Sequence, residues 1–242
     1  MSNDLHHYNF YQGEVLLFNK PLTWTSFQLV NKVKWLLKNH PSLLVDGTKI
    51  KPKVGHAGTL DPLATGLLIV CTGKKTKEIE SYQAQEKEYT GTIYLGATTP
   101  CFDLEQEIDQ RYPTEHITKE LIYEAAERLS GKQFQTPPIF SAVKVNGKRA
   151  YDLARKGEVP EIKAKEIEIK EFHITRIALP EVDFKIVCSK GTYIRSLARD
   201  FGLLLNSGAH LTALCRTRIG EYRLDRSINV EDFAKEMAEF KN

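Results

Sequence analysis

Apolar residues recur along this chain at two spacings, one typical of helices and the other of strands. Helical spacing predicts helices over residues 26–37, 118–129, 192–205 and 230–240. Alternating or continuous apolar runs predict strands over residues 14–18, 67–71, 87–95, 167–174, 182–188 and 211–222, the fourth with a change of register. Because strands and helices do not alternate one for one, the pattern predicts an α+β fold with a mixed sheet rather than a doubly wound parallel one.

Turn and capping residues mark the ends of these elements. The pair Thr25-Ser26 can cap the first helix, Gly131 follows the second, and Asn206-Ser207-Gly208 stops the third. Glycines and prolines are otherwise spread as punctuation, with no internal repeat and no low-complexity segment. We therefore expect one domain spanning residues 1–242.

Composition places the chain among ordinary globular proteins. Of its 242 residues, 41% are hydrophobic and 27% are charged, and the longest apolar run, residues 67–71, is far shorter than the roughly 20 residues of a membrane-spanning helix. The N-terminal residues show no basic segment followed by an apolar one, so we expect a cytoplasmic protein that does not enter a membrane. A formal charge of +3 is too small to indicate a nucleic-acid partner by itself.

Spacing excludes several kinds of cofactor and metal site. The four cysteines stand far apart, and the seven histidines do not cluster at ligand spacing, so neither a metal site nor a disulfide framework is expected. No two glycines stand at i and i+2, which excludes the Gly-x-Gly-x-x-Gly fingerprint of dinucleotide binding. The Gly-x-Ser-x-Gly and His-Glu-x-x-His motifs of common hydrolases are also missing from the sequence.

The most unusual segment is residues 55–66, Gly-His-Ala-Gly-Thr-Leu-Asp-Pro-Leu-Ala-Thr-Gly. Its three glycines and one proline predict a constrained loop that leads into the apolar run 67–71. Asp61 stands between Leu60 and Pro62, where a carboxylate risks desolvation unless a cation meets it. On composition alone, the simpler explanation is an Asp-Pro turn that caps local amides, although loops at strand ends often carry chemistry.

A candidate cation lies where a predicted strand turns into a helix, in Ser189-Lys190-Gly191-Thr192-Tyr193-Ile194-Arg195. Arg195 falls in the first turn of that helix, where a positive charge is unfavourable for the helix dipole. Its positive charge is therefore expected to pair with a negative group elsewhere, which is Asp61, another carboxylate or a phosphate. A solvated arginine beside nearby charges explains the residue about equally well.

Together these segments resemble the TruB-type tRNA pseudouridine synthases. The resemblance rests on the loop 55–66, on Lys87-Glu88-Tyr89 leading into Leu95-Gly96, and on residues 189–195. It continues through residues 16–21, 138–144 and 208–220, and it covers nearly the whole chain in order. That family isomerises uridine 55 in the TΨC loop of tRNA. The resemblance implies a central mixed, mostly antiparallel sheet flanked by helices, with an RNA-binding insertion.

The resemblance also implies a role for each matching residue. Asp61 is implied as the catalytic nucleophile, and Arg195 as the partner that keeps its carboxylate ionised. Tyr89 is implied to stack on the target uracil and to assist proton transfer. The other residues implied to bind the substrate are His56, Tyr193 and Leu214. The chemistry needs no metal and no cofactor.

Contacts with the tRNA backbone are implied mainly for an insertion at about residues 135–165, where basic residues surround Tyr151. From the residues alone, the alternative explanation of this segment is a solvated basic hairpin and short helix. The candidate backbone contacts are Lys144, Lys148, Arg149, Arg155 and Lys156 in the insertion, and Arg216 and Arg218 on a later strand.

Two departures from the family pattern and two alternative functions remain. Many members carry a second arginine where this chain has Cys215, and many bacterial members extend into a PUA-type RNA-binding module, so we expect a short form with the catalytic domain alone.

A non-catalytic RNA-binding protein on the same scaffold is one alternative, and a synthase acting on another RNA is the second. Retention of Asp61, Tyr89 and Arg195 favours an enzyme.

Overall fold

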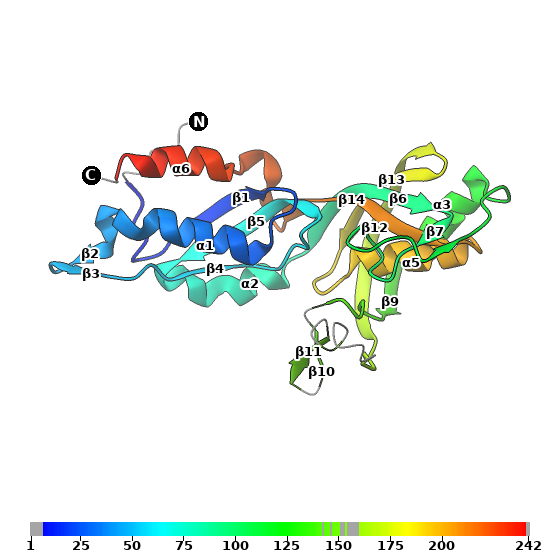
Figure 1. The fold of residues 1–242 in the computed structure, drawn as a ribbon, viewed down its shortest axis with the longest axis horizontal. Helices are drawn as coiled ribbons and strands as arrows, with labels where there is room; N and C mark the ends of the chain where they lie inside the picture. Colours follow the sequence, from blue (N-terminus) through cyan, green and yellow to red (C-terminus); the bar gives the residue numbers. More distant parts are fainter. Residues whose placement is uncertain (1–6, 142, 146, 151–152, 154–159, 241–242) are drawn as a thin grey trace. The chain divides into compact units, whose positions relative to one another are not determined.

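The computed structural model describes residues 7–141, 143–145, 147–150, 153 and 160–240 (Figure 1). The chain forms two compact units, one made of Met1–Gln85 with Cys215–Asn242 and the other of Glu86–Leu214. The long strand β14 (Ala209–Ile219) contributes its last five residues to the first unit and its first six to the second.

The first unit is built on a sheet in which β5 is central. The order is β1-β5-β14, with β4 also paired to β5 and β15 to β14; the β1, β4 and β15 pairings are antiparallel. The elements are β1 (Val15–Lys20), α1 (Ser26–Leu36), β2 (Leu44–Val45), β3 (Thr48–Lys49), β4 (Val54–His56), β5 (Ala64–Thr72), α2 (Ile79–Ala84), β15 (Tyr222–Arg223) and α6 (Val230–Ala238), with short 3-10 turns at Leu37–Asn39, Pro41–Leu43, Gly73–Glu78 and Leu224–Arg226.

Alternation along β1 and β5 gives this sheet two buried faces. Leu16, Phe18, Leu68 and Val70 pack with apolar residues of α1 and α6, which lie together in Figure 1. Leu17, Leu67, Ile69 and Cys71 pack on the other face with residues of α2 and β15. Because both faces are covered, eight of the nine residues of β5 are buried, and the strand is a rigid support for the loop that precedes it.

The second unit contains the remainder of the same nine-stranded sheet, in the order β14-β6-β13-β12-β9, with antiparallel pairing from β6 to β9. Its core includes Phe172, Phe184 and Phe201, whose rings are in contact. The elements are β6 (Lys87–Leu95), β7 (Ala97–Thr98), β8 (Gln110–Arg111), α3 (Lys119–Arg128), β9 (Gly131–Gln135), β10 (Lys144–Val145), β11 (Lys148–Arg149), β12 (Lys165–Ala178), β13 (Glu181–Cys188) and α5 (Ile194–Leu204).

The α+β class and the mostly antiparallel sheet expected from the sequence are confirmed. The register change predicted between Ile169 and Phe172 is found in the β12–β13 pairing between Ile169 and Glu171, and a second one, which was not predicted, lies between Ile174 and Arg176. Thr25 caps α1 through a complete capping box, and Asn206 follows α5 with a left-handed φ of 50°. The helix α2 and the two-residue strands were not predicted, because they are too short to show a period.

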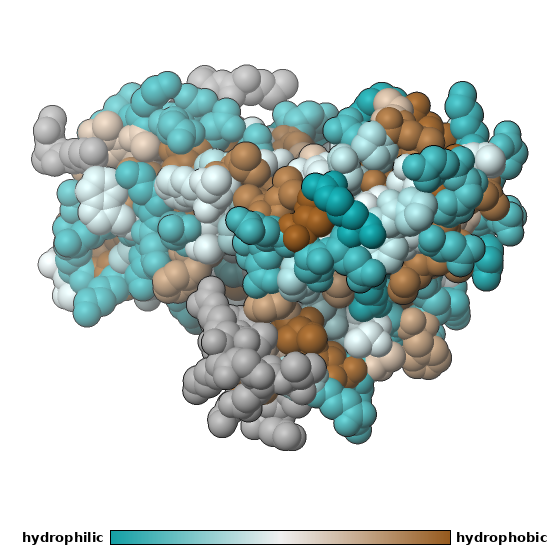
Figure 2. Space-filling model, turned by 45° about the vertical axis from the view of Figure 1, so that its right-hand side comes forward, coloured by the Kyte–Doolittle hydropathy of each residue, from teal (hydrophilic) through white to brown (hydrophobic). Residues whose placement is uncertain are grey.

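Figure 2 shows hydrophobic residues at the surface among hydrophilic ones, and the most exposed large ones include Phe27 and Phe134. In the part of the chain that the structure describes, no helix has the length and apolar character needed to cross a membrane.

Candidate functional site

Asp61 lies half-buried in the loop between β4 and β5, and both of its neighbours are anchored through their backbones. The Ser26 hydroxyl accepts a hydrogen bond from the Leu60 N–H (2.9 Å) and donates one to the Leu60 carbonyl (3.2 Å). On the other side, the Thr23 N–H donates to the Pro62 carbonyl over 2.8 Å. The loop therefore holds the carboxylate on a backbone that cannot easily shift.

Lys20, at the end of β1, is fully buried beneath the same loop. Its ammonium group donates to the carbonyls of Pro21 (2.9 Å), Trp24 (2.5 Å) and Pro62 (3.3 Å). Burial lowers the pKa of Lys20 to about 8, although the charge of Asp61 acts in the opposite direction. The loop thus has a positive group below it as well as hydrogen bonds beside it.

Arg216, on β14, braces the start of the loop rather than facing solvent. Its side chain is 1% exposed, with Nε donating to the Leu67 carbonyl (2.8 Å) and Nη2 to the Gly58 carbonyl (3.1 Å). At Gly66 (φ 102°) a Cβ atom would stand 2.3 Å from the Arg216 carbonyl oxygen, so only glycine allows the two strands to meet there. The expected contact of Arg216 with the RNA backbone is not supported, because protein carbonyls occupy its guanidinium.

Two other predicted residues lie in the first unit. His56, on β4, is partly buried, and its pKa is lowered by that burial and by the charge of Arg216 despite an opposing effect of the Gly58 backbone. The imidazole is therefore neutral near pH 7, a form suited to stacking or to a neutral hydrogen bond. Arg218 is half-buried and donates to the Gly220 carbonyl over 2.9 Å.

In the second unit, Arg195 lies in the first turn of α5 with 5% of its surface exposed. Its guanidinium donates to the carbonyls of Cys101 (3.1 Å) and Phe140 (2.9 Å), and its Nε lies 3.7 Å from the Asp103 carboxylate. Asp103 is therefore a carboxylate that lies close to the positive charge of Arg195. This fits one of the alternatives that the sequence left open, a carboxylate other than Asp61. The predicted pairing with Asp61 joins residues of different units and stays a prediction.

The start of α5 is held by a buried amide side chain. Gln135, at the end of β9 and 3% exposed, accepts from the Tyr193 N–H (2.8 Å) and donates to the Tyr193 carbonyl (3.1 Å). Ser196 adds a hydrogen bond to the Thr136 carbonyl over 2.9 Å. These contacts fix the backbone of Tyr193, the residue before the helix, and with it the direction of Arg195.

The remaining pocket residues lie on strands of the second unit. Tyr89 is 8% exposed on β6, opposite Ile186 of β13, and Leu214 is half-buried at the end of this unit's part of β14. The structure therefore groups the predicted site residues in two sets. His56, Asp61, Arg216 and Arg218 belong to the first unit, and Tyr89, Tyr193, Arg195 and Leu214 to the second.

The predicted basic insertion is described only in part. The hairpin of β10 and β11 carries Lys144, Lys148 and Arg149, whose side chains lie outside the described part of the structure. Tyr151, Arg155 and Lys156 lie outside the described residues altogether. Their assignment to RNA contact stays a prediction.

Four functional candidates were missed in the sequence: Lys20, Ser26, Asp103 and Gln135. Each is a polar residue at most 5% exposed that bonds to a predicted site residue or to the backbone beside one. Lys20 belongs to residues 16–21, a segment in which the chain resembles the family, and this resemblance was the one sequence signal that pointed to Lys20. The other three make their contacts with residues distant in sequence, which no local pattern reveals.

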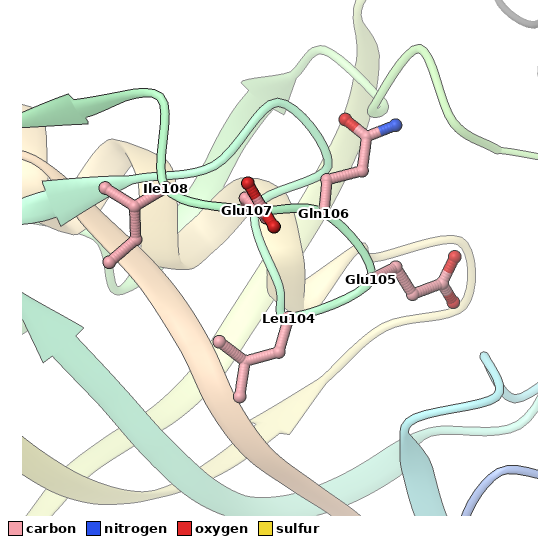
Figure 3. A pocket seen from close by; sticks show the side chains of 5 residues that line it. All are labelled: Leu104, Glu105, Gln106, Glu107 and Ile108. Atoms are coloured by element: carbon pink, nitrogen blue, oxygen red, sulfur yellow. The ribbon is translucent and has the colours of Figure 1, made fainter.

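A hollow of about 580 Å³ is lined by Leu104, Glu105, Gln106, Glu107 and Ile108, consecutive residues of the loop between β7 and β8 (Figure 3). It contains none of the predicted site residues, and its two glutamates would repel a phosphate backbone. Among the described residues, no group of three or more His, Cys, Asp or Glu is arranged to hold a metal ion.

Solved structures with a similar fold support the fold described above. A chain of a crystal structure of a Cbf5-Nop10-Gar1 complex is 26% identical with a TM-score of 0.69, and the match covers 94% of this chain but only 55% of that one. A chain of an archaeal box H/ACA sRNP Nop10-Cbf5 complex is 22% identical with a TM-score of 0.68, over 99% of this chain and 59% of that one. The second likeness concerns the fold alone.

Comparison of sequences is more specific. A protein of Phocaeicola vulgatus named tRNA pseudouridine synthase B is 60% identical over 93% of each chain, and one of Flavobacterium johnsoniae with the same name is 58% identical over 93% of this chain and 96% of its own. Residues 46–194 match the TruB family pseudouridylate synthase N-terminal domain, and residues 195–242 match the tRNA pseudouridylate synthase B C-terminal domain. The chain therefore belongs to the TruB family of pseudouridylate synthases, which are isomerases.

Proposed function

We propose that this chain converts uridine 55 in the TΨC loop of cytoplasmic tRNA to pseudouridine, with Asp61 as the nucleophile. The observation that carries the proposal is the anchoring of Asp61: a carboxylate stands on a loop fixed at both neighbours, at the entrance to a buried strand, above a buried lysine. The shared name of two relatives at 60% and 58% identity, tRNA pseudouridine synthase B, supports the substrate.

The reaction breaks the N1–C1′ glycosidic bond, forms a C1′–C5 bond, removes the proton from C5 and leaves a proton on N1. No electron is gained or lost, so the residues need to supply only a nucleophile, a place to hold the detached base and a route for one proton. Asp61 supplies the nucleophile by attacking either the ribose or the base. Tyr89 is our candidate for moving the proton.

The target base must leave the stack of the tRNA elbow before reaction, which costs a few kcal/mol. Stacking on an aromatic ring returns about 1–3 kcal/mol per base. Tyr89 suits this purpose because its strand is paired on both sides, with β14 and β13, which holds the backbone that carries the ring. In the proposal, Tyr193 and Leu214 enclose the base, and neutral His56 contacts the RNA beside it.

Binding of the tRNA backbone is assigned to Lys144, Lys148, Arg149 and Arg218. Arg216 leaves this set, because its guanidinium is buried against two carbonyls. Arg195 is kept as the predicted partner of Asp61, oriented by Asp103 and two backbone carbonyls.

The first test is tritium release from TΨC stem-loop RNA labelled with [5-³H]uridine. We expect Asp61→Asn to abolish release, because an amide is neither charged nor nucleophilic. Asp46→Asn, an exposed aspartate of a tight turn in the same unit, is the matched control and should release tritium at the wild-type rate. Full activity of Asp61→Asn would refute the mechanism.

The second test concerns the substrate. Pseudouridines are mapped in cells that lack the gene, with the wild-type gene and the Asp61→Asn gene each restored separately. We expect position 55 of tRNA to stay uridine in the deletion and in the variant, and to be modified with the wild type. Unchanged modification of position 55 in the deletion strain would instead indicate another RNA as substrate.

A further inference from the structure

The N-terminal turn of α1 contacts the backbone of the Asp61 loop through one buried hydroxyl group. Ser26 is 2% exposed, and its Oγ both accepts from the N–H and donates to the carbonyl of Leu60, which is itself 4% exposed. These two segments are 34 residues apart in sequence. The hydroxyl therefore acts as a two-point clip on the residue directly before Asp61.

Helix capping does not explain this serine. Thr25 is the N-cap residue of α1: its side chain accepts from the Gln28 N–H over 3.1 Å, and the Gln28 side chain accepts from the Thr25 N–H over 2.7 Å. The capping box is complete without Ser26. The Ser26 hydroxyl is thus committed to the loop and not to its own helix.

The residue after Asp61 is held by the same segment of chain. Thr23 takes a left-handed φ of 69°, a conformation that is costly for a β-branched residue, and its N–H donates to the Pro62 carbonyl. The carbonyl of Asp61 accepts from the Ala64 N–H over 3.1 Å. With the backbone fixed on both sides, only the two side-chain torsions of Asp61 remain to aim its carboxylate.

We propose that Ser26 is a positioning residue for the pseudouridine synthase reaction, which sets the direction of the Asp61 carboxylate by clipping the Leu60 backbone. This inference rests on the proposed role of Asp61. Because a misplacement of about 1 Å costs roughly 100-fold in rate, the expected loss on removing the clip is about 10- to 100-fold in turnover.

The test compares Ser26→Ala, Ser26→Thr and Ser207→Ala with the wild type. Ser207 is 3% exposed and its hydroxyl donates to the Pro113 carbonyl, so Ser207→Ala removes a buried hydroxyl in the other unit by the same chemical change. Single-turnover tritium release gives the rate of the chemical step, and filter binding gives the Kd for the stem-loop. Hydrogen exchange follows the Leu60 amide.

We expect Ser26→Ala to lose 10- to 100-fold in single-turnover rate with a Kd within twofold of the wild type, and to lose protection of the Leu60 amide. Ser26→Thr keeps the hydroxyl and should recover most of the rate, whereas Ser207→Ala should keep both the rate and the Leu60 protection. Thermal unfolding of all variants confirms that they are folded at the assay temperature.

A Ser26→Ala rate within twofold of the wild type, or equal losses in Ser26→Ala and Ser207→Ala, would overturn the inference. So would a loss confined to Kd. Asp61→Asn, measured alongside, distinguishes failure of the Ser26 role from failure of the Asp61 role. If Asp61→Asn is inactive while Ser26→Ala has the wild-type rate, only the positioning role of Ser26 fails. If Asp61→Asn is fully active, the proposed role of Asp61 and the inference fail together.

Discussion

Asp61 in the first unit and Arg195 in the second are both held by hydrogen bonds, but at different points of the residue. The Asp61 loop is gripped at the backbones of Leu60 and Pro62, while Arg195 is gripped at its guanidinium by two carbonyls and the Asp103 carboxylate. In the proposed mechanism the Asp61 carboxylate reacts with the substrate, whereas Arg195 only orients it and can donate its hydrogen bonds to the protein. Truncation of the two side chains should therefore have different consequences.

The largest effect is expected for Arg195→Met. It leaves Asp103 and two carbonyls without their buried partner, so we expect a loss of about 3–5 kcal/mol in the free energy of unfolding. We also expect turnover to fall at least about 100-fold, with RNA affinity nearly unchanged, if Arg195 serves Asp61. Chemical unfolding and single-turnover assays measure the two quantities.

Arg199→Met is the matched control for this prediction. Arg199 lies on the same helix, is about one quarter exposed, pairs with its neighbour Asp200 and stands over the ring of Phe102. Partly exposed contacts of these two kinds contribute about 1 kcal/mol each, so stability should fall by only about 1–2 kcal/mol and turnover should change little. Equal losses of turnover and affinity in Arg195→Met would indicate a phosphate contact instead.

A smaller effect is expected for Arg216→Met. This variant distinguishes a structural role of Arg216, which braces the loop, from a contact between Arg216 and RNA. Loss of the hydrogen bonds to Leu67 and Gly58 should cost about 3 kcal/mol of unfolding free energy. The dependence of RNA affinity on salt should keep its slope, because no phosphate contact is removed. A slope shallower by about 0.7 would contradict the bracing role. Arg218→Met, at a candidate contact, is the comparison in which the slope should become shallower.

The smallest effect concerns pH and Lys20, whose pKa is lowered to about 8, mainly by burial. Above that pH the neutral amine has two N–H donors for three carbonyls, so its hold on Pro62, the longest of the three bonds, weakens. We expect turnover to fall about two- to threefold as pH rises through 8, measured by single-turnover assays between pH 6.5 and 9. The fall should be missing in Lys20→Met and kept in Lys34→Arg.

Stability should move in the opposite direction over a neighbouring window. Between pH 8 and the ordinary lysine pKa of 10.5, the unfolded chain keeps a proton that folded Lys20 has lost. The contribution of Lys20 to the free energy of unfolding therefore rises with pH in that window and is constant below it. Chemical unfolding of the wild type and Lys20→Met at pH 7.5, 8.5 and 9.5 checks the sign; a difference that does not grow with pH would contradict it.

The sequence predicted what depends on short-range periodicity. Strand β6 was expected at 87–95 and is found at Lys87–Leu95, and Thr25 caps the helix that it was expected to cap. The site residues were identified because their motifs resemble those of a known family. The motifs did not show what surrounds these residues in the fold. The contact of Ser26 with Leu60, that of Gln135 with Tyr193 and that of Arg216 with Gly58 join residues 34, 58 and 158 positions apart. Alternation shows that Arg216 and Arg218 share a strand face, but not that protein covers Arg216.

The arrangement of the chain also sets an order for its maturation during synthesis. The first unit is interrupted in sequence by the whole of the second, and residues 215–242, which belong to the first unit, are made after the second. Arg216, which braces Gly58, and α6, which covers one face of β1 and β5, belong to that late segment. During synthesis the residues of the second unit, 86–214, are therefore made before Arg216, and the Asp61 loop receives its brace only afterwards.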